Sequence, residues 1–355
     1  MHEVTRRAPT ALVGLPAEAQ HDAGIDADVR RPGRSRARDN PVVDSGMPRQ
    51  SKYLIAVPVA AMVLAGCSIL RPGRAIDQDL ETRTDSLEAR IQRRIATVPN
   101  ALVGVAYHDL RRGDTLYINA DTSFHAASTM KVPVMIELFR AFDAGRLRPD
   151  QTIPLTNQFA SIVDGSAYSL GADADSDSSL YSKVGSPVTI RELIDRMITR
   201  SSNLATNTVI ALVDAKNAQA TARALGARNI RVLRGVEDSK AYAAGMSNTT
   251  TARDLAVLME AIETERAASP ASAQAMREIL MRQEFNAEIP AGVPPGTRVA
   301  HKTGWITAVL HDAAIVYPEG RKPYILVVLT SGIPDQQVAR QLIVDISRLV
   351  WEHTR

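Results

Sequence analysis

Strand-like segments lie near both ends of the periodic part of the chain and enclose a long helical stretch, and this order constrains the fold most. Near the front, ALVGVAYHD alternates around Val103, Val105 and Tyr107, and LRRGD then leads into TLYIN, which predicts a β-hairpin. Near the end, three strand-like segments follow one another across turns: TRVAHKTG, DAAIVYP and YILVVLTSG. Sheet strands from both ends therefore flank a helical middle.

Helices are predicted at both margins of this arrangement. Apolar residues recur at helical spacing before Pro99, which ends the first helix: Ile76, Leu80, Leu87, Ile91 and Ile95. A final helix from about Asp335 carries four apolar residues on one face: Val338, Leu342, Ile346 and Leu349. We expect an α/β fold combined with an all-α part, in which an antiparallel β-sheet is flanked by N- and C-terminal helices and holds an inserted helical domain.

Two helix starts inside the helical middle carry capping signals. Thr189 with Glu192, and Thr251 with Asp254, each form a capping box ahead of an apolar run. Both pairs therefore predict where a helix begins.

A polar stretch at 157–187 contains DADSDSS, whose aspartates 173, 175 and 177 fit the start of a calcium-binding loop. Such a loop needs a glycine where Ser178 stands and a closing glutamate where Val184 stands. We therefore predict a solvated loop, long enough to border a cleft.

The first part of the chain has the plan of an export signal. Residues 1–46 lack apolar periodicity and are predicted to be disordered, or to be an upstream extension with Met47 as the true start. From Met47, basic residues precede a short apolar run and then LAGC, which resembles a bacterial lipobox ending at Cys67. This resemblance implies lipidation of Cys67 and a membrane anchor. An ordinary cleaved signal, or a short interfacial helix with an incidental cysteine, is the alternative.

The predicted domains follow from these patterns: 1–46 an extension, 47–66 a lipoprotein signal peptide, 67–74 a linker, 75–120 with 290–355 the sheet domain, and 121–289 the helical domain.

The charge balance and the metal-binding residue types exclude several classes of function. The net charge is +3, from 42 basic and 39 acidic residues, and no basic face follows the signal region, so a nucleic-acid partner has no electrostatic support. One cysteine excludes a disulfide framework and a cysteine-based metal site. The seven histidines show no paired metal-ligand spacing, so we predict no metal and no cofactor.

Ser128 and Lys131 stand one helical turn apart in FHAASTMKVPVMIELF, at the start of an apolar helical stretch. The free backbone N–H groups and positive dipole end of a helix start favour a developing oxyanion. A serine becomes a nucleophile when a base takes its proton, and a lysine can do so only when neutral. Apolar burial lowers the pKa of a lysine, so the pair is a candidate nucleophile and base. Pro133 is expected to remove one early helical hydrogen bond.

Taken alone, S-x-x-K favours a serine N-cap followed by a lysine that reaches water. RSSNLATN, however, places Ser201 and Asn203 just after a helix, and HKTGW (301–305) ends a strand. The order S-x-x-K, S-x-N, K-T-G resembles the serine β-lactamase and penicillin-binding-protein superfamily. Class A β-lactamases are the most similar members, over residues 75–355, including MITRSSNLATNTVI, NTTTARDL and HKTGW.

The resemblance implies roles in acylation. Ser128 is then the acylated nucleophile and Lys131 a proton acceptor. Ser201 shuttles a proton to the leaving nitrogen, and Asn203 bonds the Lys131 side or the substrate amide.

The same resemblance assigns K-T-G to substrate binding. Lys302 and Thr303 would hold the substrate carboxylate, and Lys302 would keep Lys131 neutral. Gly304 completes the motif, and backbone N–H groups of Ser128 and Trp305 would form the oxyanion hole, with the Trp305 ring serving only packing.

Hydrolysis of the acyl-enzyme needs a base for water. Class A enzymes supply a glutamate from a loop between the second and third motifs, and RGVEDSKAYAAGMSN offers Glu237, 36 residues beyond Ser201. A surface acid is the alternative interpretation.

Three positions depart from the family pattern. Ser202 stands where aspartate is common, and Ala241 stands where an asparagine usually helps to hold the water. No arginine is obvious at the usual substrate-carboxylate position downstream of K-T-G, and His311 lies in that stretch. His301 and His311 flank the site strand. We expect simple strand-edge placement for both, and tuning of the pocket is the alternative. His125 is interpreted as a helix-entry residue, since no G-x-S-x-G motif accompanies it.

The sequence therefore predicts an exported, periplasmic, lipid-anchored serine β-lactamase that acts through Ser128 and Glu237. The alternatives are a D-alanyl-D-alanine peptidase or esterase on the same fold, and a β-lactam-binding protein with little turnover. The expected partners are a β-lactam or acyl-D-Ala-D-Ala-like substrate and the membrane through Cys67, with a monomeric protein.

Overall fold

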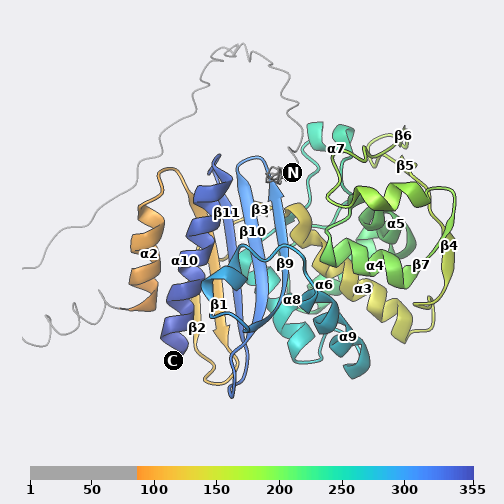
Figure 1. Cartoon of the computed structure of the whole chain (residues 1–355). Helices are drawn as coiled ribbons and strands as arrows, with labels where there is room; N and C mark the ends of the chain where they lie inside the picture. Colours follow the sequence, from red (N-terminus) through yellow and green to blue (C-terminus); the bar gives the residue numbers. More distant parts are fainter. Residues whose placement is uncertain (1–85) are drawn as a thin grey trace, which may run out of the picture. The chain divides into compact units, whose positions relative to one another are not determined.

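A five-stranded antiparallel sheet forms the centre of the structure, a computed structural model that describes residues 86–355 (Figure 1). The strand order is β2-β1-β11-β10-β9. The strands are β1 (Leu102–Asp109), β2 (Thr115–Ile118), β9 (Arg298–Ile306), β10 (Val309–Tyr317) and β11 (Tyr324–Ser331). β1 pairs with both β2 and β11, so the predicted hairpin forms and strands from distant parts of the chain meet in one sheet.

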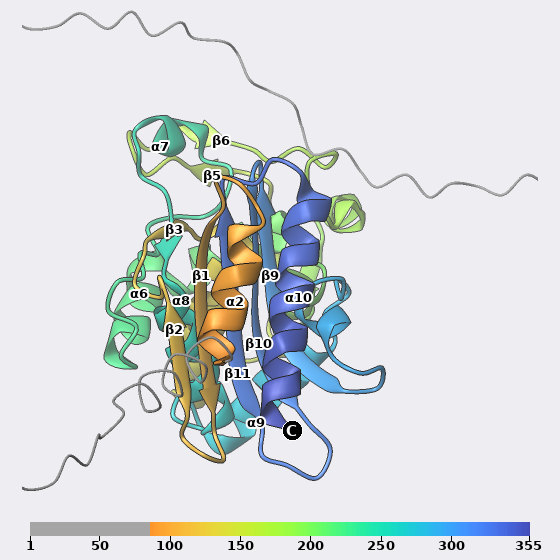
Figure 2. The same ribbon diagram turned by 90° about the vertical axis from the view of Figure 1, so that its left-hand side faces the viewer.

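Two helices lie side by side on one face of this sheet (Figure 2). They are α2 (Leu87–Ala96) and α10 (Gln336–Thr354), and they enclose a core with alternate residues of the strands, such as Val105, Tyr107 and Leu326. Leu342 and Ile346 of α10 are fully buried, as their spacing predicts, but Val338 is 39% exposed. Val338 therefore lies at the margin of the buried face, which is centred on Ala339, Leu342, Ile343 and Ile346.

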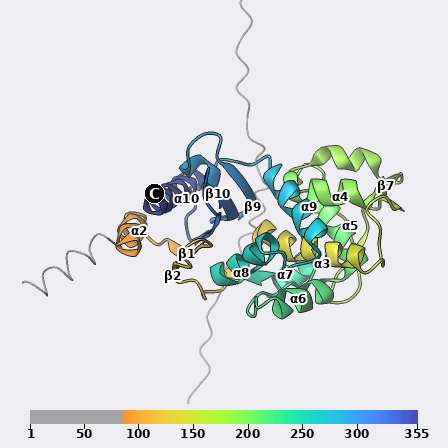
Figure 3. The same ribbon diagram turned by 90° about the horizontal axis from the view of Figure 1, so that it is seen from below.

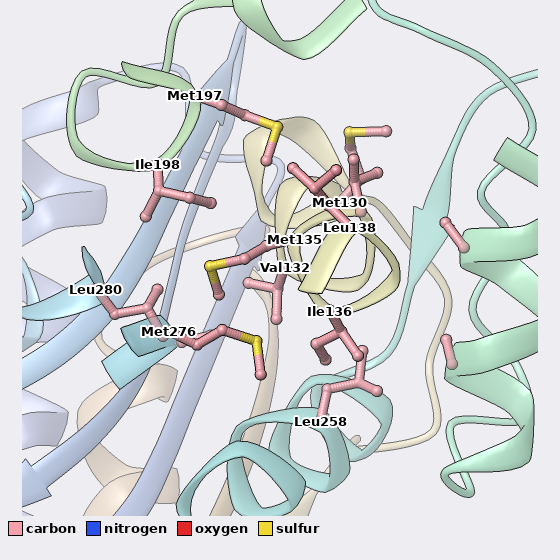
Figure 4. Packing of buried hydrophobic residues seen from close by; sticks show 14 of the residues in the cluster. Met130, Val132, Met135, Ile136, Leu138, Met197, Ile198, Leu258, Met276 and Leu280 are labelled. Atoms are coloured by element: carbon pink, nitrogen blue, oxygen red, sulfur yellow. The ribbon is translucent and has the colours of Figure 1, made fainter. Parts of the chain in front are cut away.

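The other face of the sheet packs against the helical part of the chain (Figure 3). Alternate strand residues, among them Ala313, Ile325 and Val327, join its core. Figure 4 shows how flexible methionine side chains fill the space around α3, including Met130, Met135, Met197 and Met276, all of them fully buried. One sheet therefore separates two hydrophobic cores.

The remaining helices and short strands lie between β2 and β9 in the chain. The α-helices are α3 (Lys131–Asp143), α4 (Ile190–Thr199), α5 (Asn203–Val213), α6 (Ala215–Ala224), α7 (Ser239–Ala243), α8 (Ala252–Glu263) and α9 (Pro270–Met281). The 3₁₀ helices are η1 (Ala127–Met130), η2 (Ser178–Lys183) and η3 (Ile289–Gly292). The short strands are β3 (Phe124–His125), β4 (Thr152–Pro154), β5 (Phe159–Ala160), β6 (Ala167–Tyr168), β7 (Pro187–Thr189) and β8 (Thr249–Thr250).

Both predicted capping threonines begin a helix. Thr189 accepts from the backbone N–H of Glu192 at 3.2 Å, and Thr251 accepts from that of Asp254 at 3.0 Å. The acids of the two boxes bond elsewhere: the Glu192 carboxylate accepts from Arg196, at 2.9 Å. The helix starts were predictable because the threonine is local, whereas the partners of the acids come from tertiary packing.

The signal peptide, the lipobox with Cys67 and the extension before Met47 lie outside the described residues. The boundaries proposed between sheet and helical domains stay predictions. No helix within 86–355 combines the length and the apolar character needed to cross a membrane.

Candidate active site

Ser128 lies in η1, which leads directly into α3. Ala127 has a φ of 44°, so the chain turns sharply just before the serine. Ser128 is partly exposed, whereas Lys131, the first residue of α3, is fully buried. Because α3 begins only at Lys131, Pro133 falls in its first turn, where backbone N–H groups have no α-helical acceptor. The expected loss of one helical hydrogen bond at Pro133 stays a prediction.

The K-T-G segment lies against the Ser128 turn. Gly304 approaches so closely that a Cβ atom there would lie 2.9 Å from the backbone nitrogen of Ser128. Thr303 is buried, and its hydroxyl has no hydrogen-bond partner among the described residues. The segment lies in the middle of β9, an edge strand of the sheet, so the prediction that it ends a strand is wrong. The first and third motifs thus meet in space.

Ser201 connects these two motifs to the second. It links α4 to α5 with a left-handed φ of 59°, and its hydroxyl oxygen lies 3.1 Å from Lys131 Nζ and 3.1 Å from Lys302 Nζ. Lys131 Nζ also donates to the Ser201 carbonyl and, at 3.1 Å, to Asn203 Oδ1. Lys302 Nζ donates to the Thr303 carbonyl at 3.0 Å. Four residues predicted for the site therefore form one connected cluster.

Two buried amines that share one hydroxyl disfavour each other's charge. Burial and the neighbouring Lys131 lower the pKa of Lys302 well below its ordinary value, while Asp312 and Glu288 act to raise it. The Ser201 hydroxyl can accept from a charged Lys302 and donate to a neutral Lys131. The geometry thus accommodates one ammonium and one amine, which serine activation requires.

Asn203 links the lysine pair to the predicted general base. Its Nδ2 donates to Glu237 Oε1 at 2.6 Å, while its Oδ1 accepts from Lys131. Glu237 is exposed and has a φ of 59°, so the loop turns sharply there. Ala241, four residues further on, is fully buried in α7 and offers no polar side chain. The departure noted at Ala241 therefore persists in the folded site.

The loop that carries Glu237 is anchored to α5 by an asparagine that sequence reasoning missed. Asn207 Oδ1 accepts from the Val236 N–H at 2.7 Å, and its Nδ2 donates to the Val236 carbonyl at 3.0 Å. Gly235 permits this approach, since a Cβ there would lie 2.4 Å from Asn207 Oδ1. Asn207 lies within RSSNLATN, but nothing in that segment indicates a partner near residue 236.

The acidic run is not a solvated loop throughout. Asp177 is 4% exposed and accepts from Arg196 at 2.8 Å, and Asp175 is 7% exposed and contacts the start of α5. Asp173 is exposed. The solvated-loop prediction is therefore wrong for Asp175 and Asp177, because tertiary partners turn both side chains inward.

His301 and His311 are fully buried, so the expectation of simple strand-edge placement is wrong. His301 contacts Asp312 at 2.9 Å through Nδ1 and Asn286 at 3.1 Å through Nε2. His311 Nε2 donates to the His125 carbonyl at 2.8 Å, and burial lowers the pKa of His311 to about 4. At neutral pH, His311 therefore supplies no positive charge in the stretch downstream of K-T-G.

His125 accepts from the backbone N–H of Ala127 at 3.1 Å through Nδ1, which agrees with its interpretation as a residue of the helix entry. The Trp305 ring packs edge-on against Phe285, with centroids 4.9 Å apart. Within residues 86–355, no group of three or more His, Cys, Asp or Glu side chains is arranged to bind a metal ion.

Comparisons with known proteins fit this geometry. A family model described as "Beta-lactamase enzyme family" matches residues 86–354. The chain is 24% identical to Beta-lactamase VEB-1 of Pseudomonas aeruginosa, over 76% of this chain and 91% of that protein.

Solved structures give the same picture. PBP-A is 29% identical with a TM-score of 0.65, covering 76% of this chain and 95% of PBP-A, and a variant of PBP-A is known as an acyl-enzyme complex with penicillin G. A beta-lactamase from Sphaerobacter thermophilus is 28% identical with a TM-score of 0.66, covering 76% of this chain and 97% of that one.

Proposed function

The chain belongs to the beta-lactamase enzyme family, and from that premise we propose that it hydrolyses the β-lactam ring as a class A-like serine β-lactamase. One observation carries the proposal: a single Ser201 hydroxyl lies 3.1 Å from each of two buried lysines, Lys131 and Lys302, next to the Ser128 turn. A proton acceptor and a cation for the substrate carboxylate then share one cluster, beside the turn that carries the nucleophile.

Acylation begins when Ser128 Oγ attacks the lactam carbonyl carbon and neutral Lys131 accepts the serine proton. The C–O bond forms as the C–N bond of the ring breaks, and Ser201 passes a proton to the leaving nitrogen. The backbone N–H groups of Ser128 and Trp305 stabilise the oxyanion. Gly304 permits this geometry, since the absence of a side chain lets β9 approach the backbone nitrogen of Ser128.

Substrate is oriented by its carboxylate. The Lys302 ammonium and the Thr303 hydroxyl, which is buried and has no partner among the described residues, are the groups that receive it. Asn203 presents its amide to the substrate or holds Lys131, as it does in the free protein.

Deacylation uses a water whose proton passes to the Glu237 carboxylate. The water oxygen attacks the ester carbonyl, the bond to Ser128 Oγ breaks, and a proton returns to the serine. The contact from Asn203 Nδ2 to Glu237 Oε1, at 2.6 Å, supports this role because it brings the carboxylate to the cluster.

A second candidate is a β-lactam-binding protein with little turnover. Ala241 favours it, since this buried methyl group cannot help Glu237 to hold a water. A third candidate is a D-alanyl-D-alanine peptidase or esterase on the same fold, which the similarity to PBP-A supports.

Export is part of the same proposal. The segment from Met47 to Cys67, with its LAGC lipobox, supports a lipoprotein in the periplasm, anchored to the membrane through Cys67. Radiolabelled palmitate incorporated by the wild type and lost in Cys67→Ala would test the anchor; equal labelling of both proteins would refute it.

The function is tested by mixing the purified fragment 68–355 with a chromogenic cephalosporin while following colour and intact mass. Steady turnover is expected. A single burst with a lasting adduct indicates the binding protein, and cleavage of an acyl-D-Ala-D-Ala peptide with no adduct indicates the peptidase.

Glu237→Gln tests the assigned base. It should lower kcat by on the order of 10²–10⁴-fold and trap the acyl-enzyme, since a general base contributes that much. The exposed carboxylate of Glu278, on α9, is the matched control, and Glu278→Gln should behave as the wild type. Unchanged turnover in Glu237→Gln would remove Glu237 from its role.

A further inference from the structure

The start of α5 carries two residues of the site, and its capping is divided between two distant segments. Ser201 precedes the helix and Asn203 is its first residue, with Ser202 between them where the family commonly has aspartate. Ser202 Oγ accepts from the N–H of Ala205 at 3.3 Å. A serine alone leaves the first two N–H groups of α5 without an acceptor.

Asp175 supplies the missing carboxylate from the acidic run. Its Oδ2 accepts from the N–H groups of Asn203 and Leu204, both at 2.9 Å, and the Ser202 hydroxyl lies 3.5 Å from the same atom. The first three N–H groups of α5 are thus all satisfied. A buried negative charge at this end of a helix is also favoured by the helix dipole.

The carboxylate of Asp175 is itself held in place. Its Oδ1 accepts from the Asp177 N–H at 3.0 Å, and the Tyr181 hydroxyl donates to Oδ2 at 3.1 Å. Asp177 in turn forms a buried pair with Arg196 of α4 at 2.8 Å, and Ser176 donates to the Arg200 carbonyl at 2.7 Å. The acidic run therefore makes hydrogen bonds and an ion pair to the end of α4 and to the start of α5, and it stabilises the connection between these two helices.

We propose that Asp175 is a positioning residue of the active site, standing in for the aspartate that the family commonly has at the position of Ser202. It acts through Asn203: Asp175 fixes the backbone of that residue, whose side chain contacts Lys131 and Glu237. Ser201 lies two residues before Asn203, so the same contact also limits the movement of the Ser201 backbone. The proposal rests on the proposed function of the site.

Four variants test it, each measured by kcat and KM with a chromogenic cephalosporin and by melting temperature. Asp175→Ala should lose roughly 10- to 100-fold in kcat/KM, because a misplacement of about 1 Å costs on the order of 10²-fold. Asp175→Asn, which keeps an acceptor for the two N–H groups, should lose less. Asp173→Ala, the exposed neighbour in the same run, should keep the wild-type value.

The fourth variant is a rescue. Asp175→Ala combined with Ser202→Asp returns a carboxylate to the same helix end, within the helix's own sequence, and should recover most of the lost kcat/KM. If the double variant recovers the melting temperature but not kcat/KM, capping of this helix end does not set the activity and the proposal is overturned. A wild-type kcat/KM in Asp175→Ala overturns it as well.

Amide hydrogen exchange separates this inference from the proposed function, since it needs no substrate. The N–H groups of Asn203 and Leu204 should exchange faster in Asp175→Asn than in the wild type, and no faster in Asp173→Ala. Unchanged exchange would contradict the capping contact even if the wild type hydrolyses cephalosporin. If the wild type shows the expected exchange but no turnover, the proposed function is contradicted and the capping role of Asp175 is not. If Asp175→Ala does not fold, the Asp175→Asn data decide.

Discussion

The amine of Lys302 is fully buried in the folded protein, and the charged groups around it set its pKa. Burial and Lys131 lower its pKa, whereas the carboxylates of Asp312 and Glu288 raise it. Raising the pH through this lowered pKa removes the ammonium that would bind the substrate carboxylate. In the same window the unfolded chain binds more protons than the folded one, so stability rises with pH while activity falls.

Asp312→Asn tests this balance. The change removes a negative charge that raises the pKa of Lys302 and keeps an oxygen that can accept from the Ile289 N–H, bonded at 3.0 Å in the wild type. The alkaline limb of the pH profile of kcat/KM should therefore move to lower pH. Glu319→Gln, at an exposed carboxylate in the turn after β10, should leave the limb in place. A limb that moves to higher pH in Asp312→Asn would contradict the assignment.

The site residues that could be predicted from the sequence were those that belong to a recognisable motif. Ser128, Lys131 and Ser201 were named because the residue type and spacing already imply the chemistry, and Lys131 and Ser201 lie in one hydrogen-bonded cluster that extends to Lys302. Asp175 was predicted to be a solvated acid, because the two α5 N–H groups that it caps lie 28 and 29 positions away in the chain. Such contacts leave no trace in residue type.

The loop between α6 and α8 is the element on which hydrolysis would depend. Its ends are tied by backbone hydrogen bonds of 2.8 and 3.0 Å between Arg231 and Thr249, and its tip carries Glu237. Between these points, the two bonds from Asn207 fix Val236 against α5. The position of the proposed base is thus set by a helix of the second motif.

Asn207→Ala should release this anchor and slow deacylation more than acylation. We expect kcat to fall by roughly 10- to 100-fold, since the base is displaced by about 1 Å or more, while the acyl-enzyme accumulates in the intact mass. Stopped-flow acylation and steady-state turnover measure the two steps. Asn217→Ala, at an exposed asparagine of α6, is the control and should change neither. An equal loss in both steps would show that Asn207 supports the whole site.

At this scale, periodic elements were predictable and irregular ones were not. β1, β2, β9, β10 and β11 and the caps at Thr189 and Thr251 follow from alternation and local capping. η1 was not expected, because the 3₁₀ turn before α3 is imposed by the left-handed Ala127 and the approach of Gly304. Those constraints arise only when β9 packs against the turn.

The whole described molecule depends on its sheet, since each face supports a different core. One core lies under α2 and α10, and the other contains Lys131's helix and the helices around it. β9 belongs to both, because Val299 faces the first core and Ala300 the second. A substitution that destabilises the core under α2 and α10 should therefore also destabilise the site, because the two cores share the strands of the sheet.

Leu342→Ala tests this coupling from α10, which contributes no residue to the proposed site. The side chain is fully buried, so its removal should cost about 2–5 kcal/mol of unfolding free energy and lower the melting midpoint by on the order of 10 °C. Because both cores share the strands, helical circular dichroism and cephalosporin hydrolysis should be lost over the same temperature range. Val338→Ala, at a position of the same helix that is 39% exposed, should change neither the melting midpoint nor the temperature at which hydrolysis is lost. Hydrolysis lost well below the dichroism transition of Leu342→Ala would instead mean that the site half unfolds by itself.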